Sequence, residues 1–319
     1  MKIVIAGGTG QVGSVLTRHF IERGDDVVVL SRHAAATKAR VRQWNAETLG
    51  AWSEELNGAE VVINLAGRNV NCRYTGENRR LIMESRVNST RVIGQAIALA
   101  KNPPRVWLQA STATIYAHRF DAPNDERGLI DGNEVEAPDT WRFSTEVAKS
   151  WEQTLDEAPT PRTRKVKLRS AMIMSPDRGG IFYTLLQLIR AGLGGTAASG
   201  DQFISWIHQR DFTRAIDWLI AHEKFEDAVN LAAPQPLPNR EFMATLRQAY
   251  GMPIGLPAAR WMLEIGALVL RTETELILKS RRVTPGRLIA DGFTFDFPDW
   301  ESAARELCVR WKSRNAHGR

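Results

Sequence analysis

A glycine-rich segment near the amino terminus, Gly7-Gly8-Thr9-Gly10-Gln11-Val12-Gly13, has the residue types needed to hold a phosphorylated ligand. Glycines let backbone approach a pyrophosphate, and a helix that starts there offers free N–H groups and the positive end of its dipole. The apolar run 3–6 before the segment predicts a strand. Apolar residues at helical spacing after it predict a helix. This strand–turn–helix context favours a dinucleotide-binding turn over a plain tight turn.

The end of the second expected strand, 27–30, bears on which dinucleotide would bind. NAD-binding proteins usually place Asp or Glu there to accept hydrogen bonds from the ribose 2′-hydroxyl, whereas this chain has Ser31 and Arg32. Asp25 and Asp26 lie at the opposite end of the strand. A charge-assisted hydrogen bond from Arg32 to a 2′-phosphate would contribute about 1.5–3 kcal/mol. We therefore predict NADP(H); the alternative is a solvent-facing Arg32.

Two later strand-like segments carry further candidate residues, and with them a resemblance. Asn64-Leu65-Ala66-Gly67 and Ala110-Ser111-Thr112-Ala113-Thr114-Ile115-Tyr116 resemble motifs of the extended short-chain dehydrogenases, the NAD(P)-dependent epimerase/dehydratase family. Ser205-Trp206-Ile207-His208 with Asp211, and Leu278 through Pro285-Gly286-Arg287-Leu288, are similar to a bacterial "epimerase family" branch that ends in a small domain of unknown function. The resemblance covers nearly the whole chain.

The resemblance and the glycine-rich turn together imply a set of cofactor-binding residues. It comprises Gly7, Thr9, Gly10, Gln11, Val12, Gly13, Ser31, Arg32, Leu65, Ala66, Gly67, Ala110 and Lys149.

The catalytic residues implied by the resemblance are only partly present. The family uses a tyrosine acid/base, a lysine four residues later and a serine or threonine that binds the reacting oxygen. Thr112 and Lys149 match the last two, but Thr145 stands in the tyrosine position. Tyrosine has an ordinary pKa of about 10, which a lysine ammonium can lower, whereas a threonine hydroxyl is far too weak an acid. Arg86 replaces an asparagine that the family places near the site.

Two residues keep alternative interpretations. Lys149 either hydrogen-bonds the nicotinamide ribose, as the resemblance implies, or is an ordinary surface lysine. Tyr116 is the nearest tyrosine that could replace the missing acid, but it could instead close the strand end by packing. The functional prediction is an NADP(H)-dependent oxidoreductase or epimerase-like enzyme acting on an unidentified small molecule. The alternative is a dinucleotide-binding sensor or regulatory protein without catalysis.

The alternation of short apolar runs and helical patterns predicts a doubly wound α/β fold, a parallel Rossmann sheet with a smaller, mostly helical lobe. We expect a dinucleotide-binding domain over 1–175, with later strands from about 203–232. The remainder, 176–319, would form the substrate lobe, including a helical domain at about 250–312. The cleft would open at the carboxyl ends of the strands. Asp211 is expected to cap a helix beside this cleft.

Composition excludes several other classes of function. Hydrophobic residues make up 43% and charged residues 24%, which is typical of a globular chain. The net charge of +6, from 42 basic and 36 acidic residues, forms no arm suited to nucleic acid. No apolar stretch reaches the roughly 18 residues of a membrane span, and Cys72 and Cys308 offer no metal-ligand spacing. We expect a cytoplasmic protein with no metal; whether it forms a homodimer stays open.

Overall fold

The centre of the molecule is a sheet of seven parallel strands. The computed structural model describes residues 1–34, 37–130, 137–259, 261–264 and 273–316. The strand order is β10-β6-β5-β4-β1-β2-β3, and every neighbouring pair is parallel. The strands are β1 (Lys2–Ala6), β2 (Asp26–Ser31), β3 (Arg40–Gln43), β4 (Val61–Asn64), β5 (Val106–Thr112), β6 (Arg164–Ser170) and β10 (Asp227–Leu231). This arrangement confirms the predicted doubly wound α/β class, with its switch of direction between β1 and β4.

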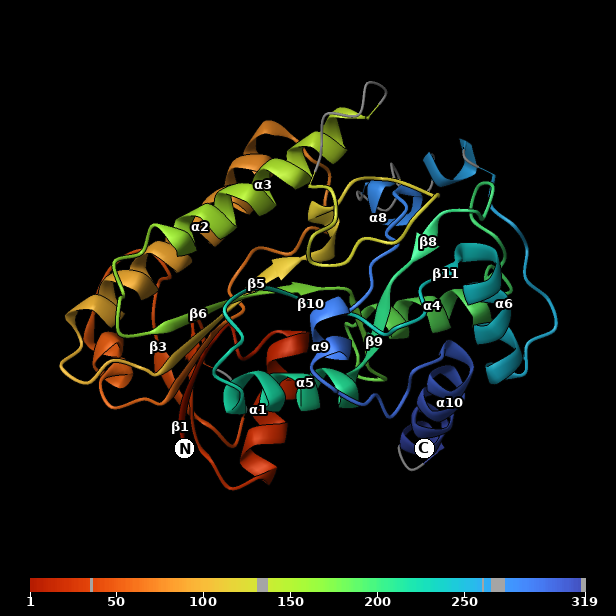
Figure 1. The fold of residues 1–319 in the computed structure, drawn as a ribbon. Coiled ribbons are helices and arrows are strands. Elements are labelled where there is room, and N and C mark those ends of the chain that lie inside the picture. The colour runs from red at the N-terminus through yellow and green to blue at the C-terminus, as the bar shows by residue number, and fades with distance from the viewer. Residues whose placement is uncertain (35–36, 131–136, 260, 265–272, 317–319) are drawn as a thin grey trace.

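Helices cover both faces of the sheet (Figure 1). The helices α1 (Gln11–Glu22) and α5 (Gln209–Ala221) lie on one face, and α2 (Gly76–Leu99) and α3 (Asp139–Asp156) lie side by side on the other. Side chains alternate between faces along a strand, so β1 sends Ile3 and Ile5 to the first face and Val4 to the second. Because both faces are buried, the strands read as continuous apolar runs.

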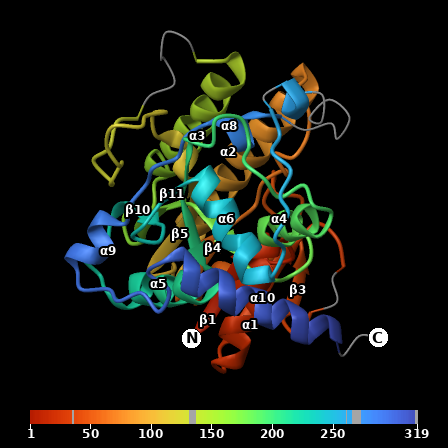
Figure 2. The ribbon, with the colours of Figure 1, turned by 90° about the vertical axis from the view of Figure 1, so that its right-hand side faces the viewer.

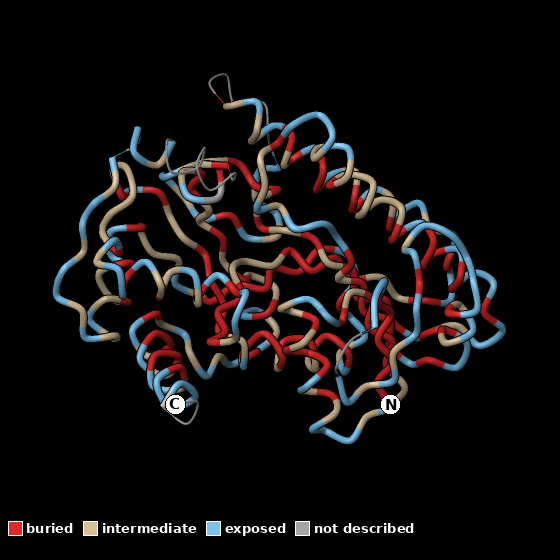
Figure 3. The backbone as a smooth tube through the Cα atoms, turned by 180° about the vertical axis from the view of Figure 1, so that it is seen from behind, coloured by how far each residue is buried: buried red, intermediate tan, exposed pale blue. Residues whose placement is uncertain are grey.

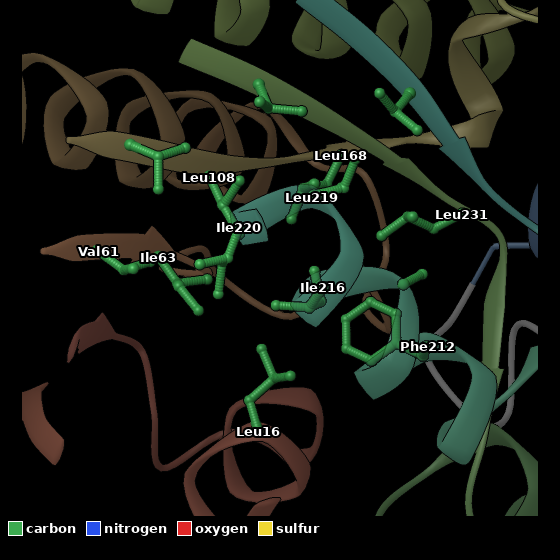
Figure 4. Close-up of a cluster of buried hydrophobic side chains, with 14 of the residues drawn as sticks. Leu16, Val61, Ile63, Leu108, Leu168, Phe212, Ile216, Leu219, Ile220 and Leu231 are labelled. Carbon is green, nitrogen blue, oxygen red and sulfur yellow. The ribbon is translucent and has the colours of Figure 1, made fainter. Parts of the chain in front are cut away.

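The core on the α1 and α5 face is built from aliphatic side chains that meet between layers. Leu16 of α1 and Ile216 of α5 face Ile63 and Leu108 of the sheet (Figure 4). Buried chain segments concentrate in the centre of the molecule, and the exposed segments lie mostly around its outside (Figure 3). The resulting layered core holds the carboxyl ends of the strands in fixed positions.

A second, mostly helical region follows β6. It contains β7 (Met172–Met174), α4 (Ile181–Arg190), β8 (Phe203–Ile204), β9 (Trp206–His208), β11 (Leu237–Pro238), α6 (Asn239–Tyr250), α8 (Glu275–Leu278), α9 (Gly286–Ala290) and α10 (Trp300–Ala316). Two-residue to three-residue strands pair as β7 with β9 and β11 with β8. Phe242 of α6 stacks on Trp300 of α10 with ring centroids 4.1 Å apart, in a core shared with α4. Figure 2 shows α4, α6 and α10 grouped together.

Polar contacts at helix ends differ in one case from the sequence prediction. Asp299 caps α10, since its Oδ1 accepts the Ser302 N–H at 2.9 Å. Asp211 does not cap α5, because that helix begins at Gln209 and His208 Nδ1 accepts the Arg210 N–H. Asp211 instead lies buried and accepts the N–H groups of Asp296 and Phe297. It therefore ties α5 to the segment before α10.

Within the described ranges, no helix has both the length and the apolar character that a bilayer crossing requires.

Candidate functional site

The glycine-rich turn between β1 and α1 is sterically constrained at three of its four glycines, Gly7, Gly8 and Gly13. Gly7 has a φ of +77°, and a Cβ there would lie 3.0 Å from backbone atoms of Leu65 and Ala66. A Cβ on Gly13 would come within 2.4 Å of the Gly7 carbonyl oxygen. A Cβ on Gly10 would meet only that same oxygen, at 3.4 Å. Gly7 and Gly13 thus serve the packing of the turn, whereas Gly10 leaves open space where a ligand can approach.

The amino terminus of α1 is suited to an anion. Its N-cap residue is Gly10, no side chain caps it, and its first turn holds no acidic residue. The free N–H groups and the helix dipole therefore remain available to a negatively charged ligand. Gln11 Nε2, on the first residue of the helix, is buried and has no hydrogen-bond partner in the part of the chain that the structure describes. The turn therefore fits a pyrophosphate.

A groove runs from this turn across the carboxyl ends of β1, β2 and β4. Eight of the predicted cofactor-binding residues line it: Gly7, Thr9, Gly10, Ser31, Arg32, Leu65, Ala66 and Gly67. Its remaining wall includes Trp44, Asn45, Glu47, Arg68 and Ser85. Of the other predicted residues, Gln11, Val12 and Gly13 form the first turn of α1, and Ala110 lies on β5.

Arg32 stands directly after β2, in this groove and exposed to solvent. Among the described residues, no carboxylate pairs with its guanidinium. The Ser31 hydroxyl beside it lies 3.5 Å from Thr9 Oγ1. Asp25 is engaged at the opposite end of the strand, where it accepts from the Met1 amino group at 2.9 Å. The groove thus presents a free cation and hydroxyls where a ribose phosphate would need them.

A second cavity lies beyond the groove, around Thr112. Its walls are largely apolar, with Val70, Ile82, Phe143, Val147 and Trp151. Its polar groups are Tyr74, Arg86, Thr112, Thr114, Ser144, Glu275 and Arg281. Thr112 Oγ1 accepts the Thr114 N–H at 3.1 Å, so its own proton is free to donate to a ligand oxygen.

Arg86 of α2 connects the groove and the cavity. It borders Gly67 of the groove, where an added Cβ would lie 3.2 Å from its guanidinium carbon, and it also lines the cavity. Its Nη1 donates to the carbonyls of Ile82 and Arg68, at 3.0 and 3.2 Å, and its guanidinium lies 5.0 Å from the Trp151 ring centre. Burial lowers the pKa of Arg86 to about 10, so the group stays cationic near neutral pH.

The carboxyl-terminal segment contributes two charged residues to the same cavity. Ser144 Oγ donates to Glu275 Oε2 at 2.6 Å, and Arg281 Nε donates to Thr114 Oγ1 at 3.0 Å. Arg281 Nη2 lies 3.9 Å from Glu275 Oε1, too far for a hydrogen bond. Burial raises the pKa of Glu275 and lowers that of Arg281. A carboxyl and a guanidinium are therefore held at the wall of the cavity, beside its other polar groups.

The structure does not bring Lys149 to Thr112. Lys149 is exposed and borders a depression beside α3, whereas Ser144, Val147 and Trp151 face the cavity. Thr145 also borders that depression, but it is buried and its Oγ1 lies 3.5 Å from Lys279 Nζ. Successive helix residues are rotated by about 100°, so a shift of one position turns a side chain away from the cleft. The interpretation of Lys149 as an ordinary surface lysine agrees with this placement, and its predicted contact with the nicotinamide ribose does not.

Tyr116 is also placed away from the cavity lining. It is buried, its hydroxyl donates to Asn230 Oδ1 at 2.7 Å, and Arg169 Nη1 donates to that hydroxyl at 3.0 Å. The residue closes the strand ends, the second of the two interpretations. The tyrosine that does line the cavity is Tyr74, whose backbone N–H donates to Glu273 Oε1 at 2.7 Å.

Three polar cavity residues carried no sequence prediction, Tyr74, Ser144 and Glu275, and Arg281 lay within the segment of the resemblance from Leu278 through Pro285 without an assigned role. They come from three segments far apart in the chain, and no local spacing links them. In the ranges that the structure describes, no group of three or more His, Cys, Asp or Glu residues could hold a metal ion.

The parallel sheet, the glycine-rich turn and the groove at the β1/β4 switch define a Rossmann-fold protein of the short-chain dehydrogenase type. A model of the NAD-dependent epimerase/dehydratase family matches residues 3–140, and a model of a domain of unknown function matches residues 258–307. Over residues 3–140 the chain is therefore similar to the NAD-dependent epimerase/dehydratase family.

Relatives match along nearly their entire length. The epimerase family protein YfhF of Bacillus subtilis is 29% identical, with 98% of this chain and all of that protein covered. The bovine epimerase family protein SDR39U1 is 28% identical over 96% of this chain and 99% of its own. The human SDR39U1 structure, solved with NADPH, superposes with a TM-score of 0.83 at 26% identity, covering 97% of this chain and 99% of that one. A Bacillus cereus UDP-N-acetylglucosamine 4-epimerase, at 17% identity and a TM-score of 0.74, shares the fold.

Proposed function

We propose that the protein is an NADP(H)-dependent oxidoreductase or epimerase that acts on a small molecule. One observation carries this proposal: the glycine-rich turn and Arg32 line one groove, and Arg86 connects that groove to the Thr112 cavity. The NADPH in the human SDR39U1 structure supports the choice of dinucleotide. The first 175 or so residues would bind it, and the helical lobe would complete the pocket for the small molecule.

Each part of the groove has a task in this proposal. The N–H groups at the start of α1 bind the pyrophosphate, with Gly10 leaving room for it. Arg32 and Ser31 bind the 2′-phosphate, and Ala66 and Gly67 flank the cofactor. NADPH supplies a hydride to a substrate carbon, or NADP⁺ accepts one. Thr112 donates its free hydroxyl proton to the oxygen on that carbon, which orients the substrate and stabilises developing negative charge.

Incubation with stereospecifically deuterated NADPH and a metabolite extract tests this function. Transfer of deuterium to a metabolite, or its loss to solvent, indicates redox chemistry. The matched control is the Thr112→Val variant, which keeps the β-branched shape and removes the donor. We expect the wild type to lose label and this variant to lose it at least about 100-fold more slowly, as for removal of an oxyanion donor.

A sensor without catalysis is the second candidate function. It is favoured by the residues of α3 that line the cavity, Phe143, Ser144, Val147 and Trp151, since none of them is a tyrosine or a lysine. Tight NADPH binding with complete retention of the label would support the sensor and overturn the enzyme. Absence of NADPH binding would overturn both.

A further inference from the structure

The cavity beside Thr112 holds a hydroxyl and a carboxyl in direct contact, from parts of the chain that are far apart. Ser144 belongs to α3, and Glu275 opens α8 in the segment matched by the domain of unknown function. Their 2.6 Å hydrogen bond is short enough for proton exchange between the two groups. Ser144 also stands on the cavity-facing side of α3, together with Val147 and Trp151.

The Glu275 carboxyl is buried in a way that leaves one oxygen free. The residue is 1% exposed, and its Oε1 has no hydrogen-bond partner in the described parts of the chain. Arg281 Nη2 lies 3.9 Å from that oxygen, beyond hydrogen-bond distance. A buried carboxylate oxygen without a donor is costly, whereas a protonated carboxyl needs less solvation. The site therefore favours a carboxyl that carries a proton.

We propose that Ser144 is a catalytic residue and that Glu275 acts through it, so that the two supply the proton that the family's tyrosine would supply. The inference rests on the proposed function and names the proton donor for it. A serine hydroxyl alone is too weak an acid, for the same reason that excludes Thr145. Glu275 behind Ser144 removes this difficulty, because Ser144 is reprotonated as it gives up its own proton.

Ser144 and Glu275 together account for the proton that a carbonyl reduction needs. With its proton on Oε2, the Glu275 carboxyl donates across the 2.6 Å contact to Ser144 Oγ, so the Ser144 hydroxyl proton turns toward the substrate. The substrate oxygen takes this hydroxyl proton, and Ser144 Oγ takes the carboxyl proton of Glu275. The carbon gains a C–H bond with the electron pair of the hydride that NADPH supplies, while the C=O π pair forms the new O–H bond. The products are an alcohol, NADP⁺ and a Glu275 carboxylate, which water reprotonates. Oxidation runs through the same transfers in reverse.

Several charged or titratable groups face this pair. Arg281 and Lys279 lie on the segment of Glu275 and lower its pKa, Glu273 raises it, and the desolvation from burial outweighs them. Tyr74 approaches from the loop before α2. Its own pKa is raised to about 12, chiefly by burial and also by Glu275. The Tyr74 phenol therefore stays protonated at neutral pH and is a competing candidate for the donor.

Infrared spectroscopy tests the buried proton without any turnover. We expect the wild type, with and without NADPH, to show a carboxylic-acid C=O band that persists above the ordinary glutamate pKa of about 4.3. Glu275→Gln should remove this band, and Ser144→Ala should shift it because the hydrogen bond is lost. Glu146→Gln, on the exposed outer side of α3, is the matched control and should leave it in place. A spectrum unchanged by Glu275→Gln would overturn the proposal.

Turnover with generic carbonyl probes tests the transfer itself. NADPH oxidation is followed with diacetyl, benzaldehyde and phenanthrenequinone. We expect Ser144→Ala to lower kcat at least about 100-fold while the NADPH dissociation constant stays unchanged, as is typical for loss of a general acid. In the wild type, kcat should fall at high pH as the Glu275 carboxyl loses its proton, and Glu275→Gln should remove this fall. Glu275→Asp, which keeps a carboxyl, should be faster than Glu275→Gln. Ser150→Ala is the control on the same helix.

The outcomes separate the two levels of inference. If the wild type does not bind NADPH, the proposed function fails. If it binds NADPH and reduces a probe, but Ser144→Ala is as fast, the Ser144–Glu275 pair is not the donor. If Tyr74→Phe abolishes turnover and Ser144→Ala does not, Tyr74 is the donor and the proposal is overturned. If NADPH binds but no probe is reduced, the infrared result decides whether Glu275 holds the proton that the proposal requires, and an unchanged spectrum in Glu275→Gln overturns the proposal.

Discussion

The selection of NADPH over NADH should depend on Arg32, and the structure allows the size of this effect to be worked out. A charge-assisted hydrogen bond contributes about 1.5–3 kcal/mol, which corresponds to about ten- to 150-fold in affinity. Arg32 is exposed, so solvent and salt weaken its interaction with a phosphate. Glu47 lines the same groove and opposes a second negative charge. We therefore expect the lower end of the range, a loss of about tenfold in NADPH affinity for Arg32→Ala.

Isothermal titration calorimetry with both dinucleotides measures this change directly. The dissociation constant for NADH should stay the same in Arg32→Ala, because that cofactor lacks the 2′-phosphate. Lys101→Ala is the matched control, since it removes an exposed positive charge from the turn between α2 and β5, at the opposite end of the strands. A ratio of NADPH to NADH affinity that is the same in the wild type and Arg32→Ala would refute the reasoning. An equal loss of NADPH affinity in Arg32→Ala and Lys101→Ala would show that only the net charge of the protein matters.

Three further predictions follow from the geometry. Gly13→Ala should lower the free energy of unfolding by roughly 1–3 kcal/mol, because the added Cβ would overlap the Gly7 carbonyl. Gly10→Ala should leave urea unfolding nearly unchanged, because its Cβ has room, but it should weaken NADPH binding by filling the space open to the ligand. Lys149→Ala should leave NADPH affinity unchanged in calorimetry, since this residue faces outward; a tenfold loss would restore the family's role for it. Glu275 has a raised pKa in the folded state, so the unfolded chain ionises first as pH rises, and stability should fall between the ordinary and the raised pKa. Urea unfolding measured between these two pH values should show the free energy of unfolding falling in the wild type and not in Glu275→Gln. An equal pH dependence of that free energy in both proteins would contradict the prediction.

The amino-acid sequence alone was enough to predict the parallel sheet and the dinucleotide groove. Continuous apolar runs such as 61–65 mark strands buried on both faces, and the turn from Gly7 to Gly13 needs only neighbours in sequence to form its shape. Arg32 follows β2 directly, so its position at the groove could also be deduced locally. These features depend on short-range periodicity and on the rule that parallel strands end at one edge.

The cavity beside the groove could not be deduced in this way. Which side of α3 faces the cleft depends on how that helix packs against α2 and the sheet, and a rotation of one residue exchanges Lys149 for Ala148 and Thr145 for Ser144. Spacing fixes which residues share a side of a helix, but not which side is buried.

Contacts between distant segments decided the remaining chemistry. Glu275 reaches Ser144 across 131 positions of the chain, and the Glu273 carboxylate holds the Tyr74 backbone across 199. No periodic pattern encodes such pairs, because they form only after the helical lobe has packed on the sheet. The dinucleotide groove is therefore a property of local sequence, while the polar chamber next to it arises from tertiary packing.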